Sequence, residues 1–220
     1  MTDVISLYIN DGLSEDEVAH QAALYGPLVE DIRALIPLGI STQADDDEIR
    51  RAREHLAAAA AILGRRRDPG PYGTRFNDAG QFRSWGNAAL GLRNAVAPPL
   101  EMNTDPDGRV WTDFHLHIGY EGPAGHTHGG VSALVLDQVL GDAARVGGSP
   151  GMTGTLTLRY RTPTPLGDLH AEAKLDRREG RKAFVTGHIA GPDGICVEAE
   201  GIFISPPWIE DARAKIDAQD

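Results

Sequence analysis

The sequence predicts an α+β fold, with an antiparallel sheet wrapped around one long central helix and a helical extension at the N-terminus. Two observations predict this arrangement. Residues 129–146 repeat apolar side chains at helical spacing around so much of the circumference that the helix must be buried. The flanking segments, 110–120 and 152–205, instead show strand-like patterns separated by glycine-containing turns. A buried helix among strands joined by short turns is typical of an α+β domain.

The N-terminal third is predicted to be helical. Ser14 begins a capping-box pattern, and Pro27 is expected to break the helix, with a second short helix ending near Ile36. Acidic residues 45–47 indicate the start of another helix, which Gly64 should end.

The change from helical to strand patterns along the sequence predicts where the domain boundaries lie. Residues 65–87 are rich in Gly, Arg, Asp and Asn, so we interpret them as a connecting segment. The chain then divides into an extension with its linker (1–85), an α+β domain (86–207) and a tail (208–220). In the domain, alternation predicts a strand from Val110 to Tyr120, joined through a turn to residues 99–103. Four further strands are expected at about 152–161, 169–177, 182–190 and 195–205.

Composition limits the classes of function. The net charge of −11 argues against a general nucleic-acid binder. The single cysteine excludes an intrachain disulfide and favours a reducing compartment. The N-terminus has no signal-peptide pattern, and no apolar run has the length of a membrane span. We therefore expect a cytoplasmic protein without membrane or nucleic-acid partners.

The start of the central helix has the chemistry of an anion-stabilising site. His128-Gly129-Gly130 leads into the helix, and glycines let a ligand approach unpaired N–H groups at its positive end. Such donors hold a carbonyl oxygen as it becomes an oxyanion. A tight turn alone is the simpler interpretation of two glycines, and the motif by itself does not exclude it.

Asp137 is the candidate catalytic carboxylate. It lies in the apolar helix among small residues, and a buried acid there is unfavourable unless it is hydrogen-bonded or functional. The small neighbours leave room for a ligand, which suits a general base. A hydrogen-bonded Asp in a helix–helix contact is the structural alternative.

These residues carry a family resemblance. His128-Gly129-Gly130 with Asp137 nine positions after the histidine resembles the hotdog-fold acyl-CoA thioesterases, in particular the branch of the phenylacetate-pathway and THEM-type enzymes. The segments 120–125 (YEGPAG), 160–167 (YRTPTPLG) and 179–182 (EGRK) are similar to the same branch in the same order. The similarity extends from about residue 97 to 205 and leaves out the N-terminal third.

The resemblance implies a hotdog fold and a site built from two chains of a homodimer. Asp137 would act as general base or nucleophile on the thioester. Gly129, with Gly130, would supply the oxyanion N–H groups, and His128 would hold their turn. Thr153 would position water.

The resemblance also implies the substrate, an acyl-CoA hydrolysed to free acid and coenzyme A. No metal or separate cofactor is expected, and the assembly would be a homodimer or a dimer of dimers. The phosphates of CoA require local cations, for which we select Arg181, Lys182 and Arg161. At Gly122 the chain lacks the Gln or Asn with which some relatives polarise the carbonyl.

One alternative is a metal-dependent cupin-like enzyme. His115 and His117, with Glu121 and the later His170, have the spacing of cupin metal ligands. The buried helix interrupts the strands that a cupin requires, and His128 stands where that pattern has glycine.

A second alternative keeps the hotdog fold but changes the chemistry to a hydratase or to acyl binding without catalysis. Dehydratases of this fold usually rely on a histidine paired with an acid, in a different sequence context. The helix carboxylate of Asp137 therefore favours hydrolysis.

Overall fold

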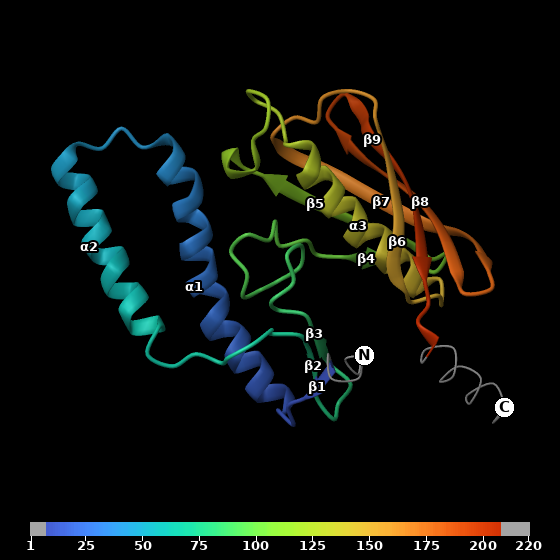
Figure 1. The fold of residues 1–220 in the computed structure, drawn as a ribbon, viewed down its shortest axis with the longest axis horizontal. Helices are drawn as coiled ribbons and strands as arrows, with labels where there is room; N and C mark the ends of the chain where they lie inside the picture. Colours follow the sequence, from blue (N-terminus) through green and yellow to red (C-terminus); the bar gives the residue numbers. More distant parts are fainter. Residues whose placement is uncertain (1–7, 208–220) are drawn as a thin grey trace. The chain divides into compact units, whose positions relative to one another are not determined.

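The computed structural model describes residues 8–207, which form two compact units (Figure 1). The first unit contains residues 8–87 together with 91–95, and the second contains 88–90 and 96–207. The predicted tail, residues 208–220, lies outside the described residues.

Two capped helices dominate the first unit. α1 (Glu15–Ser41) begins at Ser14 with the predicted capping box, and α2 (Asp46–Leu63) begins at Asp45 with another. The predicted break at Pro27 is wrong, because α1 continues through it. A proline removes one N–H from the helical ladder, while the bonds on either side remain. Neither these helices nor any other in the described part of the chain has the length and hydropathy of a membrane span.

A small sheet completes this unit, and the sequence analysis missed it. Its order is β1-β2-β3, and two of its strands lie in the predicted connecting segment. Strands of two or three residues are too short to show alternation. A buried ion pair of 2.6 Å between Asp11 and Arg83 ties the sheet together. The strands are β1 (Tyr8–Asn10), β2 (Thr74–Phe76) and β3 (Phe82–Arg83).

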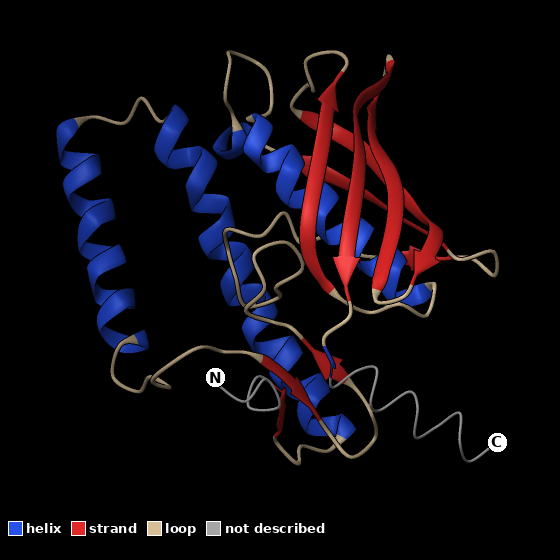
Figure 2. Cartoon of the chain, turned by 45° about the vertical axis from the view of Figure 1, so that its right-hand side comes forward, coloured by secondary structure: helices blue, strands red, loops and turns tan. Residues whose placement is uncertain are grey.

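The second unit is a six-stranded antiparallel sheet curved around α3 (Gly129–Val146), as Figures 1 and 2 show. The helix has the predicted bounds, and the sheet order is β4-β5-β7-β8-β9-β6. The α+β prediction is thereby confirmed. The strands are β4 (Asn103–Thr104), β5 (Arg109–Leu116), β6 (Met152–Tyr160), β7 (Gly167–Glu179), β8 (Lys182–Gly191) and β9 (Gly194–Ile204).

The core lies between α3 and the sheet. Val135, Leu136, Val139 and Leu140 have no exposed surface, so the predicted apolar stripe faces the strands. A Cβ on Gly187 of β8 would lie 2.8 Å from Leu140 and 2.6 Å from a backbone oxygen of β7. The helix can therefore press closely on the sheet only because that strand has no side chain there.

The alternation predicted up to Tyr120 holds only as far as Leu116. Val110, Thr112 and Leu116 are buried as expected. The chain then turns into a short 3-10 helix, η2 (Ile118–Tyr120), whose N-cap is His117. The local hydrogen bond from the Gly119 N–H to the His117 ring ends the extended conformation.

Candidate active site

The first turn of α3 leaves one backbone amide open. His128 is the N-cap, and its Nδ1 accepts the Gly130 N–H at 3.0 Å. The Val131 N–H donates to the His128 carbonyl. In the described part of the chain nothing accepts the Gly129 N–H, which is one of the orphan donors of a helix N-terminus. Of the two predicted oxyanion donors, the Gly129 N–H is thus available, whereas the Gly130 N–H already donates to His128.

Tyr160 fixes the same turn from the sheet. Its hydroxyl donates to the Gly129 carbonyl oxygen at 2.9 Å. The peptide group between Gly129 and Gly130 is therefore held at its oxygen by Tyr160 and at its N–H by His128. The sequence analysis assigned no role to Tyr160, although it begins the 160–167 motif.

A pocket of about 380 Å³ opens beside this turn. Gly129 and Tyr160 line it together with the loop that follows β6. The remaining lining residues are Pro123, His126, Thr127, Ser132, Arg161, Thr162, Pro163 and Thr164.

Asp137 lies further along α3, opposite the start of β6. The Thr153 hydroxyl donates to Asp137 Oδ1 at 2.8 Å, so two residues that were predicted together do meet. Asp137 is half-buried, next to the fully buried Leu136. Its other oxygen, Oδ2, accepts no hydrogen bond from the described residues.

The helix separates these two groups of residues. We call Asp137 with Thr153 the acid half-site, and His128, Gly129 and Tyr160 the amide half-site. Gly129 and Asp137 are eight residues apart on one helix, which corresponds to about 12 Å along its axis. One thioester carbonyl cannot reach both groups within a single chain. The chain therefore presents two halves of a site, near opposite ends of β6.

The three selected cations are also divided. Arg161 follows β6 at the amide end and pairs with Glu198 at 2.6 Å. Lys182 begins β8 at the other end of the sheet, where it is in register with Ile204 of β9. Arg181 is its neighbour and donates to the Ser205 carbonyl. A single chain therefore does not gather the three into one phosphate site.

The packing around Gly122 explains why this position has no side chain that could polarise the substrate carbonyl. A Cβ at this position would lie 2.7 Å from the Cα of His128, closer than real structures allow. The loop before α3 thus packs directly on the N-cap, and a glutamine there would displace it.

The cupin alternative is wrong. The ring of His115 bonds Asp168, and that of His170 bonds Asp113, each at 2.7 Å. His117 caps η2 instead of sharing their face. Within residues 8–207, no cluster of three or more His, Cys, Asp or Glu side chains has the geometry to hold a metal ion.

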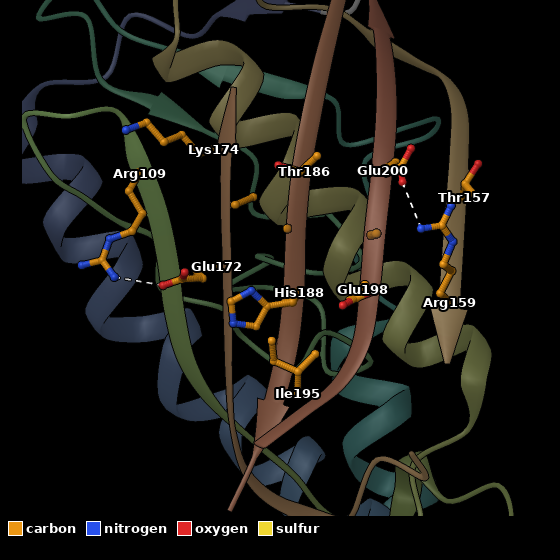
Figure 3. Close-up of a pocket in the computed structure, with 13 residues that line it drawn as sticks. Arg109, Thr157, Arg159, Glu172, Lys174, Thr186, His188, Ile195, Glu198 and Glu200 are labelled. Carbon is orange, nitrogen blue, oxygen red and sulfur yellow. Dashed lines mark hydrogen bonds and ion pairs between the residues drawn. The ribbon is translucent and has the colours of Figure 1, made fainter. Parts of the chain in front are cut away.

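A second pocket, of about 390 Å³, lies on the sheet face that points away from α3 (Figure 3). A row of polar side chains crosses five strands there, and Arg109 of β5 bonds Glu172 of β7 at 2.9 Å. Neither Asp137 nor Gly129 lines this pocket. Two ion pairs join neighbouring strands on this face, Arg109 with Glu172 and Arg159 with Glu200, and we interpret them as stabilising the exposed face of the sheet. The register places Trp111, Glu172, His188, Glu198 and Arg159 side by side across the strands.

Comparison with known proteins identifies the class. A profile of the thioesterase superfamily matches residues 124–197, which include the start of α3 and Asp137. The crystal structure of a thioesterase superfamily protein is 34% identical, with a TM-score of 0.73, and the match covers 90% of this chain and 98% of that one. The chain therefore belongs to the thioesterase superfamily and has its hotdog fold.

Among named relatives, acyl-coenzyme A thioesterase THEM4 of Xenopus laevis is 38% identical over 87 residues. That match spans 38% of this chain and 39% of the THEM4 protein.

The ion pair between Arg109 and Glu172 on the outer face of the sheet predicts that the stability of the fold depends on pH. Burial raises the pKa of Glu172, but hydrogen bonds from Arg109 and His170 outweigh it and hold that pKa below its ordinary value. A lowered carboxyl pKa stabilises the fold above the ordinary glutamate range, and this stabilisation is lost as pH falls below about 4. Glu172→Gln should therefore lower the melting temperature near neutral pH and much less at acidic pH, as measured by thermal denaturation.

Glu101→Gln is the matched control, because Glu101 is exposed and makes no ion pair with a described residue. A melting difference between wild type and Glu172→Gln that stayed constant from neutral to acidic pH would contradict this assignment.

Proposed function

We propose that this chain is an acyl-CoA thioesterase that hydrolyses its substrate to free acid and coenzyme A. The observation that carries the proposal is the Asp137 carboxylate, held by Thr153 with Oδ2 open. The thioesterase superfamily membership and the THEM4 similarity support the reaction class and the substrate.

We further propose that the site is completed by a second copy of the chain. β6 is an edge strand, and its other side pairs with no strand of the described chain. Unpaired edges of this length are unfavourable unless covered. Antiparallel pairing of two β6 strands about their centre, Leu156, would set Thr153 of one chain near Tyr160 of the other. The acid half-site would then face the partner's amide half-site.

In this arrangement each group has a defined task. Asp137 Oδ2 takes a proton from water, whose oxygen attacks the thioester carbon. The carbonyl oxygen becomes an oxyanion and accepts the partner's Gly129 N–H. Collapse of the tetrahedral intermediate breaks the C–S bond, and the proton passes from Asp137 to the CoA sulfur. Direct attack by the Asp137 carboxylate uses the same geometry: it breaks the C–S bond, releases the CoA thiolate and forms an anhydride that water then hydrolyses to the free acid and the Asp137 carboxylate.

The same pairing would unite the cations. Arg161 lies at the amide end and Arg181 with Lys182 at the other end, so antiparallel pairing brings Arg161 of one chain toward the partner's Arg181 and Lys182. We propose this composite patch as the binding site for the CoA phosphates.

The hydratase alternative has less support. Its chemistry requires a histidine–acid pair at the reacting carbon. The two close pairs between histidine and aspartate, His115–Asp168 and His170–Asp113, lie on exposed strand positions of the outer face.

Asp137→Asn tests the reaction. It preserves the shape of the side chain and its hydrogen bond to Thr153, but it removes the base. We expect kcat/KM on an acyl-CoA panel to fall by about 10²-fold to 10⁴-fold, measured by release of free thiol. The fold and oligomeric state should be unchanged. Near-normal turnover would remove Asp137 from the mechanism, and binding without thiol release by the wild type would favour an acyl-binding protein.

Gly129→Pro tests the oxyanion donor. Gly129 is the first residue of α3, where proline is well tolerated, and His128 already has the extended backbone that a following proline requires. The substitution therefore removes the N–H with little change in the helix. We expect kcat to fall by about 10²-fold to 10³-fold.

Gly129→Ala is the matched control. It keeps the N–H and adds a Cβ 3.2 Å from the Tyr160 hydroxyl, a contact that a shift of a few tenths of an ångström relieves, so most of the activity should remain. Equal losses in the two variants would show that the shape of the turn matters and not its N–H.

A further inference from the structure

α2 is a helix without a packing partner in the single chain. Every residue from 41 to 70 is exposed, and α2 has no buried side chain. An isolated helix of 18 residues is marginally stable in water, and most helices owe their stability to a packed apolar face. Something therefore covers α2 in the assembled protein.

One stripe of apolar residues runs along α2, and we call its members Ile49, Ala52, Leu56, Ala59 and Leu63 the seam. Ile49, Leu56 and Leu63 are spaced seven residues apart, and they are 39%, 49% and 47% exposed. Ala52 and Ala59 fall between them at spacings of three and four. Apolar residues at two positions in every seven are typical of a helix that packs along another helix. The two alanines would let the second helix approach closely.

The charges on α2 indicate what lies against that seam. Its N-terminal end carries the acidic run 45–48, and its C-terminal end is followed by the basic run 65–67. Asp46 and Asp47 pair with Arg50 of their own helix, but these pairs are exposed and weak. A helix that is acidic at one end and basic at the other is complementary to an antiparallel copy of itself.

We propose that α2 packs antiparallel against α2 of a second copy of this chain, with the two-fold axis at Leu56. In this register Ile49 lies against Leu63 of the other copy, and Leu56 lies against Leu56. The same register brings the acidic run 45–48 of each copy to the level of the basic run 65–67 of the other, just past the end of its helix. A two-fold contact requires this kind of self-complementary pattern.

An anionic membrane surface fits α2 less well. The seam is narrow and two of its five residues are alanine, whereas interfacial helices carry bulky apolar residues beneath a strongly basic face. The first half of α2 carries acidic residues together with Arg50, Arg51 and Arg53, so the helix has no uniformly basic face, and the whole chain has a net charge of −11. The α2 contact does not depend on the proposed thioesterase activity.

Disulfide trapping tests the contact in the full-length protein. Leu56→Cys places two sulfurs together at the axis, whereas Ala58→Cys, two residues on, points to the opposite side of the helix. The native Cys196 is buried and should not interfere. Under mild oxidation Leu56→Cys should form covalent dimers roughly tenfold faster than Ala58→Cys, because the contact raises the effective concentration of the thiols.

Charge exchange tests the register in the Leu56→Cys background. Arg65→Glu with Arg66→Glu should slow the cross-link severalfold, because like charges would meet at both ends. Adding Asp46→Arg and Asp47→Arg should restore the rate, since positions 46 and 47 then carry positive charge opposite the new acids at 65 and 66.

Equal cross-linking of Leu56→Cys and Ala58→Cys would overturn the proposal, and so would a failure of the second charge change to restore the rate. Absence of cross-linking together with co-sedimentation on phosphatidylserine vesicles would assign α2 to a lipid surface instead. Sizing the cross-linked protein by light scattering gives the assembly: a dimer if β6 and α2 join the same two chains, and a tetramer if they join different ones.

Discussion

The rigid rise of α3 is the constraint on which the functional interpretation depends. A helix fixes the separation of any two of its residues along its axis, and here Gly129 and Asp137 are about 12 Å apart along that axis. Both groups are held in place by the neighbouring β6, through Tyr160 at one end and Thr153 at the other. Neither group can move to meet the other. In the proposed mechanism the oxyanion donor and the base at one carbon therefore come from two chains.

The sheet provides the means for that combination. α3 and β6 run in opposite directions, because Tyr160 at the end of β6 bonds Gly129 at the start of α3, whereas Thr153 near the start of β6 bonds Asp137 in the middle of α3. An antiparallel copy of β6 would bring the missing half of each site into place without any change in the helix. The glycine at 187 contributes indirectly, since it lets α3 lie close to the sheet and fixes where Asp137 stands relative to the edge.

Much of the α+β domain was predictable because its elements are long. The bounds of α3 and the burial of Val110 and Leu116 follow from the periodicity of apolar residues. The errors fall where one local contact decides the structure. The hydrogen bond to His117 ends β5 early, and the two- and three-residue strands after α2 contain no period to detect.

The candidate site was predictable to a similar extent. Asp137 and Gly129 could be selected from motif and spacing, Thr153 only from the family resemblance, and the hydrogen bond between Thr153 and Asp137 is present. The engagement of the Gly130 amide by His128 depends on a side-chain rotamer, and the Tyr160 contact depends on strand placement, so neither is visible in sequence. The separation of Arg161 from Lys182 likewise follows from the order of strands in the sheet.

The central claim is that each active site takes its acid from one chain and its amide from another, and mixing two inactive variants tests it most directly. Asp137→Asn and Gly129→Pro chains are unfolded together, refolded, and assayed for thiol release from acyl-CoA. If the site is shared, each mixed dimer regains one intact site, and random pairing restores about one quarter of wild-type activity. Activity no higher than the average of the two separate variants would contradict the account.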